Sequence, residues 1–159
     1  MTSMTRKVII VYESLYGNTR IVAETIIGGM QGVEAVLKEL REVDINRMAE
    51  YDLIVIGSPN HYGGPTKGIR DFIDRLKSLN PDGKYFAVFD TYLGKGFHEK
   101  AVKRMEKRIS ETLPGLRKIA PALSIAVQGS KGPIAEAELP RCKEFGKTIA
   151  AELASKAAP

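Results

Sequence analysis

The chain has 159 residues, 43% of them hydrophobic, which is enough for a single core, so we expect one domain over residues 1–159. One cysteine, Cys142, cannot form an intrachain disulfide, and with His61 and His98 as the other soft ligands a structural metal site is not expected. No apolar run reaches the roughly 18 residues of a membrane span, and residues 1–7 are too short and polar to begin a secretory signal. We therefore expect a soluble, cytoplasmic protein that does not bind membranes.

The formal net charge is +5, and the segment 95–118 accounts for all of it. This segment carries eight basic residues against three acidic ones, namely Lys95, Lys100, Lys103, Arg104, Lys107, Arg108, Arg117 and Lys118 against Glu99, Glu106 and Glu111. It has one aromatic residue, Phe97, and no recognition motif, so nucleic acid is not an expected partner. Two interpretations stay open: a solvated helix face, or a surface on which an acidic protein partner docks.

Residues 6–12 form the first predicted strand, which is apolar on both faces. It leads into S-L-Y-G-N-T, residues 14–19, and then into a predicted helix over residues 19–31. A strand that feeds a turn of hydroxyls and glycine at a helix N-terminus gathers backbone N–H groups and the positive end of the helix dipole, so we expect an anion there. The loop fits neither the lysine-bearing NTPase pattern nor G-x-G-x-x-G, which argues against a nucleoside triphosphate or a pyrophosphate. The alternative is a capped turn without a ligand.

The middle of the chain predicts two more strands and a loop rich in proline and glycine. A weaker strand over 34–40 and a short helix over 45–50 precede residues 52–57, which are apolar on both faces, as in a parallel sheet covered by helices. The loop 58–65 contains two prolines and two glycines, and Pro65 is expected to open a helix that ends at residues 80–83.

The last part of the chain continues the alternation. Residues 84–90 predict a strand that leads into another glycine-containing loop, residues 91–96. A helix over 98–113, a strand over 122–127 and a helix over 138–155 complete the chain. Cys142 lies on the apolar stripe of the last helix, so we expect a packed, unreactive thiol.

Five strands alternating with five helices indicate an α/β protein, a doubly wound five-stranded parallel sheet with helices on both faces and right-handed crossovers. Ligands of such sheets bind beyond the carboxyl ends of the strands. The loops 14–19, 58–65 and 91–96 all follow strands, so we expect them to meet at one edge.

The second and third loops could hold a ring beside the anion. Tyr62 and Tyr92 offer aromatic faces, and backbone groups around Asn60, Gly63 and Gly94 could bind the edge of a heterocycle. A flat ligand with one phosphate therefore fits the three loops together.

These loops resemble those of the flavodoxin family, and the resemblance covers essentially the whole chain. S-L-Y-G-N-T is similar to the family's hydroxyl-x-x-Gly-x-Thr phosphate loop, and G-S-P-N-H-Y-G-G-P and T-Y-L-G are similar to its two ring loops. The resemblance implies the strand order 2-1-3-4-5 and noncovalently bound FMN. It implies three groups of site residues: Ser14, Tyr16, Asn18 and Thr19, with the backbone of Leu15 and Gly17, at the phosphate; Pro59, Asn60, His61, Tyr62 and Gly63 on one side of the ring; and Thr91, Tyr92, Leu93 and Gly94 on the other.

Two features depart from the usual family pattern. The chain has no Trp to stack on the ring, and it is basic where short-chain flavodoxins are acidic. The stretch G-G-P-T-K-G-I-R-D-F-I-D-R-L is more similar to the flavodoxin domains of larger flavoproteins and to flavodoxin-like quinone reductases. The basic flank predicts a less negative lower reduction potential than in acidic relatives.

The resemblance implies a one-electron transfer protein that shuttles electrons between redox partner proteins. We expect a monomer or weak dimer, and the charge of residues 95–118 favours acidic partners docking near this segment. The flavin would do the chemistry, so no residue is assigned a catalytic role. The alternative is an FMN-dependent NAD(P)H:quinone reductase in which His61 or Tyr92 contacts the substrate; an exposed loop histidine is an equal interpretation of His61. A phospho-acceptor receiver domain on the same scaffold is a third reading, for which Glu13 and Asp90 are isolated acidic candidates.

Overall fold

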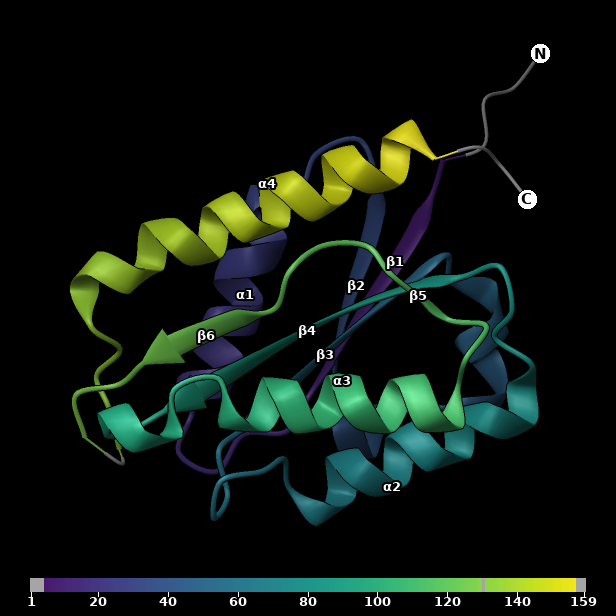
Figure 1. Ribbon diagram of the computed structural model, residues 1–159. Helices are drawn as coiled ribbons and strands as arrows, with labels where there is room; N and C mark the ends of the chain where they lie inside the picture. Colours follow the sequence, from purple (N-terminus) through teal and green to yellow (C-terminus); the bar gives the residue numbers. More distant parts are fainter. Residues whose placement is uncertain (1–4, 130, 157–159) are drawn as a thin grey trace.

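In the computed structural model, which describes residues 5–129 and 131–156, a parallel sheet separates two pairs of helices (Figure 1). The strands are β1 (Lys7–Tyr12), β2 (Glu34–Glu39), β3 (Leu53–Pro59), β4 (Tyr85–Tyr92), β5 (Arg117–Lys118) and β6 (Leu123–Ala126). The α-helices are α1 (Asn18–Gly29), α2 (Lys67–Leu76), α3 (Lys100–Thr112) and α4 (Leu139–Ser155), and the 3₁₀ segments are η1 (Leu40–Glu42), η2 (Ile45–Glu50), η3 (Lys77–Leu79), η4 (Lys95–Phe97) and η5 (Glu136–Glu138). Most boundaries lie within two residues of the predicted ranges.

The sheet has the order β2-β1-β3-β4-β5, and all of its pairings are parallel, which confirms the predicted fold class and strand order. Ser58 of β3 lies opposite Asp90 of β4 in the register, and Tyr12 of β1 lies opposite Gly57. The carboxyl ends of the three central strands therefore lie side by side, and the loops that follow them start from one edge.

The far edge of the sheet differs from the prediction, because two short strands replace one. β5 pairs with the first residues of β4 and β6 with its last residues, Phe89 to Tyr92. Pro121 lies between the two strands and has no N–H to donate to the ladder, which explains the interruption. The two pieces occupy the place of the predicted fifth strand.

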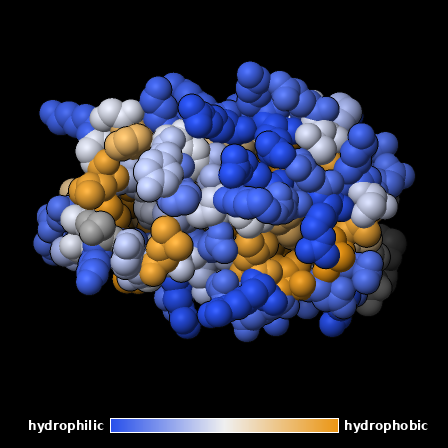
Figure 2. All heavy atoms as spheres, turned by 90° about the horizontal axis from the view of Figure 1, so that it is seen from below, coloured by the Kyte–Doolittle hydropathy of each residue, from blue (hydrophilic) through white to orange (hydrophobic). Residues whose placement is uncertain are grey.

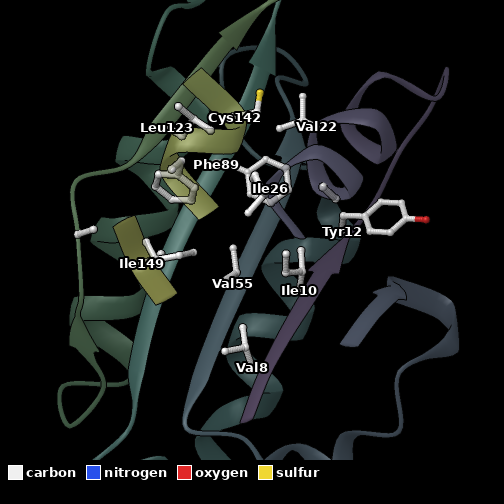
Figure 3. Packing of buried hydrophobic residues seen from close by; sticks show 14 of the residues in the cluster. Val8, Ile10, Tyr12, Val22, Ile26, Val55, Phe89, Leu123, Cys142 and Ile149 are labelled. Atoms are coloured by element: carbon white, nitrogen blue, oxygen red, sulfur yellow. The ribbon is translucent and has the colours of Figure 1, made fainter. Parts of the chain in front are cut away.

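Each face of the sheet has its own core, because alternate residues of a strand point to opposite faces. On one side Val8 and Ile10 of β1 pack with Val22 and Ile26 of α1 and Ile149 of α4 (Figure 3). On the other side the remaining core residues of the strands pack against α2 and α3. Cys142 is fully buried in the first core, and burial raises the pKa of its thiol to about 11, which confirms the expected packed thiol.

α1 and α4 approach each other closely through two glycines. A Cβ added to Gly146 would lie 1.9 Å from the carbonyl oxygen of Ile26, and one added to Gly29 would lie 2.0 Å from that of Lys143. The absence of side chains at these two positions therefore sets how closely α4 packs on α1.

Two helix predictions need correction. The predicted helix over 45–50 is the 3₁₀ segment η2, in which the Asp44 carboxylate accepts the Asn46 N–H. α2 begins after Thr66 rather than at Pro65, because the Thr66 hydroxyl caps it by accepting the Ile69 N–H at 3.3 Å. Within the described residues no helix is both long and apolar enough to cross a membrane.

Candidate functional site

A cavity of about 270 Å³ opens at the carboxyl edge of the sheet, where the loops after β1, β3 and β4 meet. Its lining residues are Ser14, Leu15, Tyr16, Asn18, Thr19, Pro59, Asn60, Tyr62, Thr91, Tyr92, Leu93, Phe97 and Val127. The structure thus brings all three predicted loops to one cavity. Four predicted residues, Gly17, His61, Gly63 and Gly94, do not line it and instead shape the loops that do.

The first loop presents the N-terminus of α1 to this cavity. Gly17 is the N-cap residue and adopts a left-handed conformation with φ of 93°, which few residues other than glycine adopt easily. The Ser14 hydroxyl accepts the Gly17 N–H at 2.9 Å and so fixes the turn. Gly17 has no side chain with which to cap the helix, so the positive end of the α1 dipole remains for an anion.

Thr91 connects the three loops. Its Oγ1 lies 3.2 Å from Oγ1 of Thr19, and both side chains are buried. Its carbonyl oxygen accepts the backbone N–H of Asn60 at 2.9 Å and the Asn60 side-chain amide at 3.1 Å. These bonds fix the relative positions of the anion loop and the two ring loops.

The second loop folds into a tight hairpin with Tyr62 at its tip. The His61 N–H donates to the Gly64 carbonyl at 2.7 Å, and the Gly64 N–H donates back to the His61 carbonyl at 3.2 Å. Tyr62 and Gly63 both have positive φ, 54° and 81°, which is the pattern of a type I′ turn. A tyrosine is unusual in this conformation, and here its side chain is 90% exposed, so the hairpin presents an aromatic ring at the mouth of the cavity.

Exposed apolar side chains line much of the cavity. Of the large hydrophobic side chains that are exposed in the described part of the chain, all except Ile21 line it: Leu15, Tyr16, Tyr62, Leu93 and Phe97. A flat aromatic ligand would cover apolar surface that water now contacts.

One buried polar atom also points to a ligand. Oδ1 of Asn60 is buried and has no hydrogen-bond partner among the described residues, although Asn60 lines the cavity. A buried acceptor without a partner is costly, and a ligand N–H would satisfy it. The open helix end, the apolar lining and this acceptor together fit a ligand with a phosphate and a heterocyclic ring.

Asp90 is fully buried beside Thr91 in β4 and joins this strand to α3 and β6. Its Oδ2 accepts the Val102 N–H of the first turn of α3 at 3.1 Å, and its Oδ1 accepts the Ser124 hydroxyl of β6 at 2.5 Å. Burial raises the pKa of this carboxyl to about 6, while the bonds from Ser124 and Val102 favour its ionised form.

Within the described residues no three His, Cys, Asp or Glu side chains lie close enough together to hold a metal ion. The acidic cluster that a receiver domain needs is likewise not found there.

Sequence reasoning missed Phe97 and Val127. Phe97 follows the third loop in η4, and its ring would lie 3.8 Å from a Cβ on Gly63, so it supports the hairpin as well as the cavity. The signal available in the sequence was that the one aromatic residue of the basic segment directly follows G-K-G. Val127 directly follows β6, and its position at the carboxyl edge could have been expected from the topology.

Gly132 adds a contact from the loop after β6. A Cβ on this residue would lie 2.6 Å from Oδ1 of Asn18, so the loop packs closely against the anion loop.

Fold and site together define a class: a doubly wound α/β domain that binds a ring and a phosphate at the carboxyl edge of its sheet. Residues 9–129 match the flavodoxin domain, so the chain belongs to the flavodoxin domain family. FMN is therefore its cofactor, and the observed cavity fits it.

Three known proteins are similar to this chain in sequence or structure. A flavodoxin from the domain Archaea superposes with a TM-score of 0.79 at 28% identity, over 93% of this chain and 99% of that one. The type A flavoprotein fprA of Rhodobacter capsulatus is 28% identical over 165 residues, 99% of this chain and 36% of that protein. An NAD(P)H dehydrogenase (quinone) of Chromohalobacter salexigens is 28% identical over 102 residues, 49% of this chain and 51% of that protein. The chain thus spans about a third to a half of the length of these two curated relatives.

Proposed function

We propose that this protein is a one-electron carrier that holds FMN at the carboxyl edge of its sheet and exchanges electrons with redox partner proteins. The chemistry of the cavity lining carries this proposal. Among the described residues that line the cavity there are hydroxyl, amide and apolar side chains, and no carboxylate, imidazole, amine or thiol. Such a lining binds and orients a flavin, and it contains no base that would activate its Ser, Thr or Tyr hydroxyls.

The residues divide between the two ends of the cofactor. Ser14, Tyr16, Asn18 and Thr19, with the backbone of Leu15 and Gly17, would hold the phosphate at the N-terminus of α1. Pro59, Asn60 and Tyr62 would border one side of the ring, and Thr91, Tyr92 and Leu93 the other. Bound FMN supplies an electron-accepting ring, while the protein controls access to it and its potential.

The similarity to the archaeal flavodoxin, 28% identical over 99% of that chain, supports an electron-carrier function. We further propose that the partners include acidic redox proteins, because the excess positive charge lies in residues 95–118. We expect the carrier to act as a monomer or weak dimer.

The test has two stages. The protein is first mixed with FMN and passed through a sizing column, and flavin absorbance should co-elute with the protein. The loaded protein is then photoreduced with EDTA as the electron donor and mixed with oxidised redox proteins, which it should reduce one electron at a time. A protein that never retains flavin would refute the proposal.

A second candidate is an FMN-dependent NAD(P)H:quinone reductase, which the similarity to the Chromohalobacter protein favours. Steady-state oxidation of NADH or NADPH with a quinone acceptor distinguishes the two. Rapid multiple turnover without a protein partner would favour the reductase.

A further inference from the structure

We propose that an acidic redox protein docks on one surface at the mouth of the cavity, where the exposed apolar side chains of Tyr62, Leu93 and Phe97 adjoin the cations Lys95, Lys100 and Arg104. We call this the docking surface. The inference rests on the proposed electron-carrier function and adds to it where the partner binds and which charges select it.

The apolar centre of the docking surface is built from two segments that support each other. Tyr62 is 90% exposed, Leu93 45% and Phe97 44%, and all three line the cavity. Phe97 lies under Gly63 of the hairpin, and the Arg104 side chain would lie 3.2 Å from a Cβ on Gly64. The hairpin and the start of α3 therefore form one continuous surface, and a partner that covers its apolar centre would approach the bound cofactor closely.

The cations of this surface are free to attract a partner. Lys95, Lys100 and Arg104 form no ion pair with any residue that the structure describes. Farther along the same segment, Arg108 is paired with Asp74 of α2 and Lys118 with Glu106. Six cations of residues 95–118 form no ion pair with a described residue, and four of them, Lys95, Lys100, Lys103 and Arg104, lie in the first ten residues of the segment, the end nearest the cavity.

Acidic groups at the docking surface are few. Glu99 is the one acidic residue between Lys95 and Arg104, and its carboxylate lies 3.5 Å from Nδ1 of His98. Figure 2, which views the molecule from the side of α2 and α3, shows a mostly hydrophilic face with hydrophobic atoms at its left end and in a second group right of centre. That end is where the carboxyl ends of the strands lie in Figure 1.

An apolar centre with a charged rim of one sign is the arrangement that selects a partner of opposite charge. The rim steers the encounter and sets its salt dependence, and the apolar centre is buried in the complex. A basic partner would be repelled, so the surface favours a small acidic protein whose redox centre lies near its own surface.

The test uses the FMN-loaded full chain and a reduced [2Fe–2S] ferredoxin as the acidic probe, with the second-order rate of flavin reduction followed by stopped flow at several ionic strengths. The charge-reversal variant K95E/K100E is compared with K143E/K147E on α4, which changes the net charge equally; Lys143 and Lys147 are both exposed. Lys100 is the first residue of α3, where a Glu is favoured by the helix dipole, so the variant should fold.

We expect the wild-type rate to fall as salt rises, and K95E/K100E to lower the low-salt rate by about 10-fold or more and to remove most of its salt dependence. K143E/K147E should stay within about twofold of wild type, as expected for charges away from the docking site. Equal effects of the two variants, or a wild-type rate that rises with salt, would overturn the docking surface. Oxidation of the reduced protein by ferricytochrome c, a basic electron acceptor, would also overturn it if that rate showed the same salt dependence and the same response to the two variants.

Reoxidation of the reduced protein by dissolved dioxygen separates this proposal from the proposed function. Dioxygen is small and uncharged, so the three proteins should be reoxidised at similar rates if they carry flavin. Loss of flavin in the wild type would refute the carrier itself, whereas flavin-loaded proteins that dioxygen reoxidises but that react unselectively with protein partners refute the docking surface alone.

Discussion

The hydroxyl oxygens of Thr19 and Thr91 lie 3.2 Å apart, although 72 residues separate them in the chain. Thr19 belongs to the first turn of α1 and Thr91 to the end of β4, so their contact joins the anion loop to a ring loop. Both side chains are almost fully buried, at 1% and 5% exposure. The phosphate end and the ring end of the site are therefore held at a fixed separation before any cofactor binds, which lowers the entropy lost on binding.

Replacing Thr19 tests the anion site. Thr19→Glu places a second negative charge beside the cofactor phosphate, and like charges about 4 Å apart near a protein surface repel by about 4 kcal/mol. We expect a loss of FMN affinity of at least about 100-fold, measured by the quenching of FMN fluorescence on titration. Thr19→Ser keeps the hydroxyl and should bind FMN almost as wild type does. If the Glu variant folds and binds FMN normally, the phosphate lies elsewhere.

Tyr62 allows the turn and the ring to be tested separately. Asn-Gly is the preferred pair for a type I′ turn, so Tyr62→Asn should keep the hairpin while it removes the aromatic face. We expect unchanged unfolding by urea and a roughly 10-fold weaker binding of FMN, since an aromatic contact contributes about 0.5–1.5 kcal/mol beyond the area that it buries.

Tyr62→Phe is the control and should bind like wild type. Tyr62→Val places a β-branched side chain at a residue with positive φ, a conformation that such side chains disfavour, so it should lower stability instead. An Asn variant with full FMN affinity would show that Tyr62 does not contact the ring.

Because α1 and α4 approach each other closely, we predict that one methyl group added between them lowers the stability of the protein strongly. In Gly146→Ala the new Cβ would lie 1.9 Å from the Ile26 carbonyl oxygen, so α4 must move away from α1. We expect the free energy of unfolding to fall by about 1–3 kcal/mol, the usual cost of overpacking a core. Gly28→Ala, in α1 with no atom within 4 Å of its added Cβ, should instead raise stability by about 0.5–1 kcal/mol. Equal stabilities in urea would contradict the packing described for these helices.

Much of this fold could be predicted from local patterns, because its central strands are apolar on both faces and its helices carry clear apolar stripes. Val8 to Val11 and Leu53 to Ile56 are examples: all are buried, which the unbroken apolar runs indicate directly. The interruption of the edge strand at Pro121 was not predicted, because a short apolar run does not show which of its backbone N–H groups bond to the neighbouring strand.

The site was less predictable where it depends on contacts between distant segments. The three loops could be assigned to one edge from topology, but Phe97 reaches the cavity because η4 turns its ring under Gly63. Asp90 appeared as an isolated carboxylate in the sequence, and its role emerges from α3 and β6, which supply its hydrogen-bond donors. Such roles follow from tertiary packing, which no local pattern encodes.

The buried carboxyl of Asp90 predicts a pH dependence of stability. Burial raises its pKa from the usual 3.8 to about 6 in the folded protein. A raised carboxyl pKa means that the folded state binds the proton more tightly than the unfolded state, so this stabilisation is complete below about 3.8 and is lost as the pH rises through about 6. A shift of the pKa from 3.8 to about 6 corresponds to a change of about 3 kcal/mol in the free energy of unfolding.

Asp90→Asn removes the titration and retains an acceptor for the Val102 N–H. The stability of wild type relative to this variant should therefore decrease between pH 4 and pH 7, as measured by urea unfolding at each pH. Ser124→Ala removes a hydrogen bond that favours the ionised carboxyl, so its transition should move to higher pH than that of wild type. Parallel pH profiles for wild type and Asp90→Asn would show that Asp90 does not titrate in this range.

The cations beside the cavity should also shift the reduction potential of the cofactor. Reduction adds negative charge to the ring, which Lys95 and Lys100 favour and which carboxylates in their place would oppose. Two unit charges about 10 Å apart in water interact by about 0.4 kcal/mol, which corresponds to on the order of 20 mV for one electron. In a spectroscopic redox titration we therefore expect the lower potential to be less negative than in acidic flavodoxins, and to become more negative in K95E/K100E.

K143E/K147E should leave the lower potential nearly unchanged. The shift in K95E/K100E should shrink at high salt, because screening weakens interactions between exposed charges. A lower potential as negative as that of the acidic proteins would mean that backbone contacts to the ring, rather than these side-chain charges, determine it.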